Sequence, residues 1–336
     1  MISPQKNEDI LIKWIFGEII YNKHNGKQIT DQNQWKWATN TRFQKIMYNV
    51  AENFDIPITR SWYMWGGYIH SPLSEKIGFN TYMKRYANKP ELVEKLRIQI
   101  KDLGFNTDTI INEIIKQTKY FTSASMNQIL PVYYKVKTPS EYVLLYISKQ
   151  NLNDILEIFS ENNNYKEKKH LYELEDNYQH NYYIYDEESK ALLDEDIITS
   201  TKNKFYTLVN TAIDKIETYV LEEKIIENHV LSFFKDISNY YKDYIWNPYA
   251  SIVSQNTLKG PRAIEEKKIM AEKEYKSISF GSSNFDNLTI RLKKENIEPS
   301  FKEYKLLNAI SPLDKNVKEM LNELLNIYQN EDADHE

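Results

Sequence analysis

Histidine 70 and the charged residues before it are the first side chains in this sequence whose types suggest chemistry. His70 follows a cluster of Trp, Tyr and Gly residues, and Arg60 lies ten positions upstream. An imidazole beside a guanidinium is a pair that binds RNA or cleaves it by acid–base catalysis. The competing interpretation is that His70 only packs on the turn before the next helix. None of the six histidines has the HExxH or HxxxH spacing that places two metal ligands on one helix face.

Three other groups of polar residues have a simpler explanation than catalysis. Glu274-Tyr275-Lys276 has the ExK spacing of one class of metal-dependent nucleases, but its surroundings, AIEEKKIMAEKEYK, are typical of a solvated helix face. Asp194-Glu195-Asp196 has the oxygens that a divalent cation prefers, and an acidic loop explains it equally well. His170 and His180 lie in a polar segment that favours a solvated loop. The sequence therefore predicts no catalytic residues, no metal site and no cofactor.

Phosphate-binding and nucleophile motifs are also missing from the sequence. There are eight glycines and no GxxxxGK[ST], GxGxxG or GxSxG motif. There are no cysteines, which excludes disulfides, thiolate metal sites and cysteine nucleophiles.

The aromatic cluster of residues 60–70 is the most distinctive feature of the chain. Trp62, Tyr63, Trp65 and Tyr68 surround Gly66-Gly67, with the basic residues Arg42, Lys45 and Arg60 nearby. Such a cluster fits a core plug between two helices, a surface that binds a protein, or a platform that stacks bases and neutralises phosphates. The residues that we expect to form a partner-binding site are Arg60, Trp62, Tyr63, Trp65, Tyr68 and His70.

Two helices must position this cluster. Apolar residues recur with helical spacing before it, at Phe43, Ile46, Met47, Val50 and Phe54. Thr41 and Gln44 predict a capping box at the start of that helix. Pro57 ends the helix, because proline lacks a backbone donor. Ser71-Pro72 predicts the start of the next helix.

The remaining pattern predicts an all-α protein of two helical domains, residues 1–137 and 138–336. A small polar segment at 122–128 precedes the boundary near Lys137, and Thr138-Pro139 predicts a helix start after it. Residues 160–200 form a polar insertion without a steady helical period, where we expect a loop and a small β-hairpin around Tyr182–Tyr185. Long helices are expected over 200–246, a charged helix over 263–275, a loop over 280–284 and a last helix after Ser311-Pro312.

Composition and charge set the class of protein. The chain has 336 residues, 41% of them hydrophobic, and 26 tyrosines, which is enough to build an aromatic core. The apolar stretch near the N-terminus is too short and too charged for a membrane span, and no signal-peptide pattern follows it. We expect a cytoplasmic protein. Residues 1–137 carry a net charge of +7 and the remainder −12, against −5 overall. This asymmetry fits a basic surface for nucleic acid, or two parts that dock on each other.

Residues 41–75 resemble the SocA-like, or Panacea, antitoxin domain. That family has a helix of the type K/R-x-Q-K-L-L-Y followed by an aromatic-rich turn with Gly-Pro. Here the matching residues are Arg42, Gln44, Lys45, Ile46, Met47 and Tyr48, then Trp65-Gly66 and Ser71-Pro72. The chain departs from the family by having Gly66-Gly67 where the family has Gly-Pro. The resemblance covers about 35 of 336 residues, and it implies a small helical domain that neutralises a toxin partner in a prokaryotic defence operon, without catalysis.

These observations predict a non-catalytic interaction or regulatory protein, antitoxin-like or part of a defence system, that binds a protein partner through residues 60–72. The alternative is a nucleic-acid-binding protein, or a metal-independent ribonuclease that uses Arg60 and His70. A third interpretation is a scaffold whose acidic helices over 200–330 assemble into a larger complex. Complete burial of Trp62 and Trp65, with no exposed aromatic residue nearby, would exclude the predicted contact.

Overall fold

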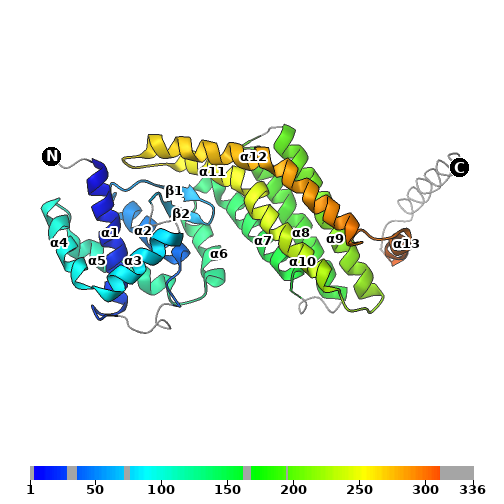
Figure 1. Ribbon diagram of the computed structural model, residues 1–336, viewed down its shortest axis with the longest axis horizontal. Helices are drawn as coiled ribbons and strands as arrows, with labels where there is room; N and C mark the ends of the chain where they lie inside the picture. The colour runs from blue at the N-terminus through cyan, green and yellow to red at the C-terminus, as the bar shows by residue number, and fades with distance from the viewer. Residues whose placement is uncertain (1–3, 29–35, 72–75, 162–167, 194–195, 311–336) are drawn as a thin grey trace. The chain divides into compact units, whose positions relative to one another are not determined.

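A computed structural model describes residues 4–28, 36–71, 76–161, 168–193 and 196–310 (Figure 1). These residues are mostly helical, and the strands among them form one two-stranded antiparallel sheet, which confirms the all-α prediction. No helix of this part of the chain combines the length and apolar character that a membrane span requires. The expected helix after Ser311-Pro312 lies outside the described residues, as do Asp194 and Glu195.

The first half of the chain contains the predicted aromatic cluster, on the hairpin that the two strands form. In chain order its elements are α1 (Pro4–Lys23), α2 (Asn40–Asn53), β1 (Arg60–Tyr63), β2 (Gly66–Ile69), α3 (Lys76–Asn88), α4 (Glu91–Asp102), α5 (Thr107–Phe121), α6 (Met126–Lys137), the 3-10 turn η3 (Ser140–Tyr142) and α7 (Val143–Phe159). The predicted helices before and after the cluster are present, but the cap differs. The hydroxyl of Thr39, and not Thr41, accepts from the amide of Arg42 at the start of α2. Pro72 lies outside the described residues.

The second half of the chain is more helical than its sequence pattern predicts. It contains α8 (Lys168–Lys190), α9 (Asp196–Leu221), α10 (Asn228–Tyr240), the π-helical turn η4 (Tyr241–Trp246), α11 (Asn247–Thr257), α12 (Ala263–Lys294) and α13 (Phe301–Ile310). The expected hairpin around Tyr182–Tyr185 was wrong, and so was the expected loop where α8 spans Lys168–Lys190; residues 162–167 and 194–195 lie outside the described residues. Tyr178, Tyr182 and Tyr185 are buried on one side of α8, and their spacing is helical although the intervening residues are polar. The expected loop over 280–284 was also wrong, since α12 continues through it.

The contacts group the chain into two compact units that alternate along the sequence. The first comprises 1–152, 181–198 and 241–281, and the second comprises 153–180, 199–240 and 282–336. The predicted single boundary near Lys137 stays a prediction, since the grouping by contacts is interleaved.

The core of the first unit is built from stacked aromatic rings. Trp62 stacks on Tyr133 with centroids 5.4 Å apart and meets the edge of Tyr146, which in turn meets Trp246 at 5.0 Å. Aromatic pairs in such geometries add stability beyond the area that they bury. This chain of rings joins the hairpin to α6, α7 and η4, so the hairpin belongs to the core of the unit.

The second unit holds a group of acids that face one another. Burial, together with Glu217, Asp214 and Asp176, raises the pKa of Glu175 to about 7, and burial with Glu217 raises the pKa of Asp214 to about 6. Tyr172 donates to Glu217 at 2.9 Å. Within the described ranges, no three histidines, aspartates or glutamates are arranged to hold a metal ion.

Candidate functional site

The hairpin β1–β2 presents the aromatic cluster, and its edges are satisfied by other parts of the first unit. Trp62 pairs with Gly67 and Tyr63 with Gly66 in the antiparallel register. On the outer edge of β1, the backbone of Arg60 exchanges two hydrogen bonds of 2.9 Å with that of Lys259. A strand edge paired in this way is not open to another chain.

Helix α2 packs beside β2, and its side chains form hydrogen bonds with the backbone of this strand. The side-chain oxygen of Gln44 accepts from the amide of Ile69 at 2.7 Å, and the amine of Lys45 donates to the carbonyl of Gly67 at 3.2 Å. Gly67 allows this approach, because a Cβ at this position would lie 2.4 Å from the ring of Tyr48. Packing between helix and hairpin thus explains Gly67, while Gly66 has a φ of 97° in the turn, which glycine adopts readily.

Three of the predicted partner-binding residues are buried. Trp62 is fully enclosed in the aromatic core. Arg60 is 3% exposed, and its guanidinium bonds Glu52, Asp55 and two backbone carbonyls. His70 is 3% exposed. These three residues contribute to the fold and do not reach a surface.

His70 lies in a buried polar network that the sequence did not reveal. Its Nε2 lies 2.7 Å from the hydroxyl of Ser61 and its Nδ1 lies 3.1 Å from the carboxylate of Glu266. The hydrogen bond from His70 is the main reason why the pKa of Glu266 is lowered from its usual value, with the charge of Arg262 acting in the same direction. Arg262 also pairs with the buried carboxylate of Glu8.

The order Ser61, His70, Glu266 is that of a nucleophile, a base and an orienting acid. A working nucleophile must meet its substrate, and Ser61 is completely buried. Its hydroxyl is also bonded to the hydroxyl of Ser254 at 2.7 Å. We therefore assign this network to the fold. Arg60 and His70 are both buried and bond different partners, so the geometry gives no support to the ribonuclease that uses this pair.

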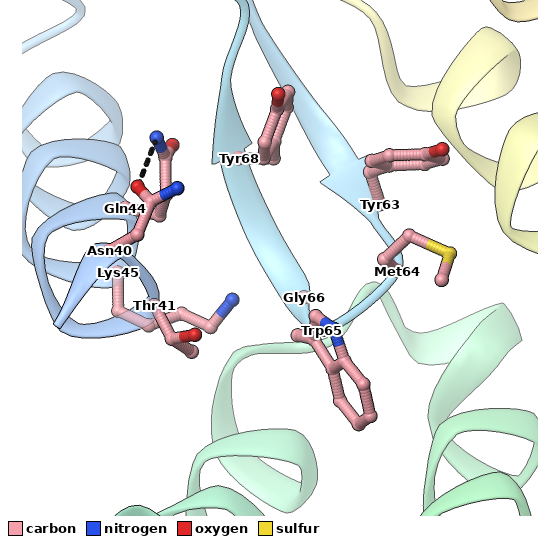
Figure 2. Close-up of a pocket in the computed structure, with 9 residues that line it drawn as sticks. All are labelled: Asn40, Thr41, Gln44, Lys45, Tyr63, Met64, Trp65, Gly66 and Tyr68. Atoms are coloured by element: carbon pink, nitrogen blue, oxygen red, sulfur yellow. Dashed lines mark hydrogen bonds between the residues drawn. The ribbon is translucent and has the colours of Figure 1, made fainter. Parts of the chain in front are cut away.

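The other half of the aromatic cluster is partly exposed and lines a pocket of about 180 Å³ (Figure 2). The turn of the hairpin forms one side and the first turns of α2 form the other. The lining residues are Asn40, Thr41, Gln44, Lys45, Tyr63, Met64, Trp65, Gly66 and Tyr68. Tyr63, Trp65 and Tyr68, which the sequence singled out, are thus brought together here.

The walls of this pocket are held rigidly. The hydroxyl of Tyr63 donates to Asn247 at 3.1 Å, and the indole of Trp246 donates to the carbonyl of Met64 at 3.0 Å. Lys149 places its amine 3.4 Å from the centroid of the Trp65 ring, a cation–π contact. The aromatic groups are therefore preorganised, and little conformational entropy is lost when they meet a ligand.

Of the described residues that line the pocket, Lys45 is the one with a charged side chain. The residue is 2% exposed, and desolvation lowers the pKa of its amine to about 7. In Figure 2 its side chain runs from α2 toward the turn of the hairpin. The helical period does not predict the burial of Lys45. This residue lies beside the apolar face formed by Phe43, Ile46 and Met47 and not on it.

The remaining basic and acidic candidates do not line this pocket. Arg42 donates to the carbonyls of Trp37 and Ala124. Glu274 lies on the helix α12, as the charge pattern indicated, and accepts from Gln255 at 2.6 Å. His170 and His180 are exposed on α8, which is a helix and not the expected loop.

A family model described as a domain of unknown function (DUF8098) matches residues 24–91. This match includes α2, the hairpin and every residue that lines the pocket. No curated protein and no solved structure matches the chain.

Proposed function

We propose that this chain is a non-catalytic interaction protein that binds a protein partner through the turn of its hairpin. The observation that carries the proposal is the partly exposed group Tyr63, Trp65 and Tyr68 around a preformed pocket. Tyrosine and tryptophan are enriched among the residues that dominate binding energy in protein interfaces. The expected site is thereby reduced from six residues to these three, joined by Lys45.

The antitoxin class of partner follows from the resemblance of residues 41–75 and remains part of the proposal. In this view the partner is a toxin of a prokaryotic defence operon, and the chain neutralises it by occupying a surface that the toxin needs. The proposal concerns the hairpin and its flanking helices. A scaffold role for the acidic helices over 200–330, which the sequence also suggested, stays a prediction.

A binding experiment with a truncated aromatic residue tests this function. Full-length tagged protein with Trp65→Ala is compared with wild type in capture from the native host, and each partner is then purified and titrated. We expect the affinity for a specific partner to fall by at least about ten-fold, since a hot-spot aromatic residue contributes 2 kcal/mol or more. Tyr183→Ala is the matched control, because Tyr183 is 67% exposed, lies in the same unit and does not line the pocket. Equal affinities for all three proteins would contradict the proposal.

Nucleic-acid binding is a second candidate, favoured by a basic hollow at the junction of α3 and α4. Lys84, Arg85 and Lys89 are exposed and line an open pocket of about 440 Å³ together with Thr81, Asn88 and Leu92. Phosphate contacts by such residues make affinity fall steeply with salt. The test is binding of a labelled RNA or DNA at two salt concentrations by wild type and by Lys84→Glu/Lys89→Glu, with Lys135→Glu as control. Binding that is equal in these variants, or independent of salt, would contradict this candidate.

A further inference from the structure

Lys45 carries a buried amine. Among the described residues it donates one hydrogen bond, to the carbonyl of Gly67, and its amine lies 5.8 Å from the centroid of the Tyr133 ring. An ammonium has three donors, so two remain. Within the described part of the chain, no carboxylate lies at ion-pair distance from this amine. A buried cation without a counter-ion is costly and is therefore uncommon.

Among the described residues that line the pocket around Lys45, none is an acid that would offset this charge. Its other lining side chains are amides, a hydroxyl, a thioether and aromatic rings. Desolvation raises the pKa of the Tyr63 and Tyr133 hydroxyls, so both stay neutral at physiological pH. Lys45 is thus the group of this pocket that changes charge near neutrality.

The size of the pocket limits what can enter it. About 180 Å³ is close to the roughly 150 Å³ cavity that accommodates benzene in an engineered protein. One acidic side chain, or one ring that carries a carboxyl group, fits such a space. The aromatic walls suit the apolar part of that group, and the amine suits its carboxylate.

We propose that this pocket receives a carboxylate group, carried by an acidic side chain of the partner, which pairs with the amine of Lys45 while its apolar stem contacts Trp65 and Tyr68. This inference rests on the proposed function for the source of the carboxylate, but the chemistry of recognition stands on the pocket alone. Pairing keeps the amine protonated, so binding takes up a fraction of a proton at pH 7.5.

The experiment uses benzoate and its neutral isostere benzamide as probes of the full chain. Isothermal titration calorimetry at pH 7.5 in two buffers of different ionisation enthalpy gives both affinity and proton uptake. We expect benzoate to bind about ten-fold more tightly than benzamide, with proton uptake for benzoate alone. Lys45→Met, which keeps the length of the side chain, is expected to bind the two probes equally. Lys135→Met on the surface of α6 is the control.

Three results would overturn the inference. The first is equal binding of the two probes by wild type. The second is a preference for benzoate that persists in Lys45→Met. The third is the absence of benzoate binding at concentrations up to about 10 mM. A purely structural Lys45, which only caps the Gly67 carbonyl, predicts the first or the third. The comparison of the two probes on wild type still tests whether the pocket prefers a carboxylate, even if Lys45→Met does not fold.

A partner experiment separates this inference from the proposed function. A partner that needs Trp65 but binds Lys45→Met as well as wild type supports the function and contradicts the acidic side chain. A benzoate preference without any partner that depends on Trp65 supports a pocket for free small carboxylates and contradicts the protein partner. Loss of the partner in Lys45→Met, with competition by benzoate but not by benzamide, supports both.

Discussion

Ser61 and His70 approach within 2.7 Å across the hairpin, between the serine hydroxyl and Nε2 of the histidine. Glu266 from α12 completes a serine–histidine–acid order, and all three residues are buried. Similar geometry serves a nucleophile in hydrolases, but here the hydroxyl is also bonded to Ser254. The network joins the hairpin to α11 and α12 and stabilises the position of the strands.

Ser61→Ala should lower stability without changing any reactivity of the chain. The substitution leaves buried polar groups on His70 and Ser254 with one partner fewer, which costs about 1–3 kcal/mol. Urea unfolding followed by circular dichroism measures this loss. A fluorophosphonate probe tests reactivity in parallel, and we expect no labelling of Ser61 in the folded protein. Labelling of wild type that disappears in Ser61→Ala would show that the network opens to substrates and would contradict a non-catalytic role.

Lys45 should make stability depend on pH in the alkaline range. Its pKa is lowered in the folded chain to about 7 from an ordinary value of 10.5, so the unfolded chain binds more protons between these values. The contribution of Lys45 to stability therefore rises with pH from about 7 to 10.5. Below pH 7 the amine is protonated in the folded chain, and the full cost of burying its charge lowers stability. The difference in unfolding free energy between wild type and Lys45→Met should accordingly shift in favour of wild type between pH 7 and pH 9.5. A difference that stays constant over this range would contradict a desolvated amine.

Gly67→Ala should disturb the contact between α2 and the hairpin. The added Cβ would lie 2.4 Å from the ring of Tyr48, and overpacking of this kind costs about 1–3 kcal/mol. Urea unfolding gives the cost. The same substitution in a Tyr48→Leu background should cost less, because the ring is no longer there. Equal costs in the two backgrounds would show that the ring of Tyr48 is not the obstacle.

Glu175→Gln should stabilise the protein at pH 8 and have little effect at pH 4. The pKa of Glu175 is raised to about 7 in the folded chain from an ordinary 4.5, so the folded chain binds more protons between these values. Wild-type stability therefore falls as pH rises from about 4.5 to 7. The neutral amide removes the cost of burying a charge and, second, the repulsion from neighbouring acids, and we expect a gain of about 1–3 kcal/mol at pH 8, given about 1.4 kcal/mol for each pKa unit. Thermal unfolding at both pH values measures it, with the exposed Glu173→Gln as control. A gain of the same size at pH 4 would contradict the assignment.

Several helices follow directly from local sequence. The segment around Phe43, Ile46, Met47 and Val50 is a helix with these residues buried, as its apolar period predicted. An apolar period predicts a helix reliably when one face of the helix is buried against the core and the other faces are polar. The same reasoning failed for α8, where Tyr178, Tyr182 and Tyr185 carry the buried face among acids and amides. Acids and amides separate these tyrosines, so the segment shows no steady apolar period, although a tyrosine ring buries like that of phenylalanine.

The sequence by itself determined that this chain is helical, that its core is aromatic and that residues 60–70 are unusual. Only the tertiary structure decided which aromatic residues of this cluster face outward. Trp62 lies in the core because its ring packs against Tyr133 of α6 and Tyr146 of α7, while Trp65 in the turn keeps part of its ring exposed. The burial of His70 between Ser61 and Glu266 also depends on a residue 196 positions away. Contacts at such separations leave no local pattern, since a helical period or a turn signal reports only on neighbours in the chain.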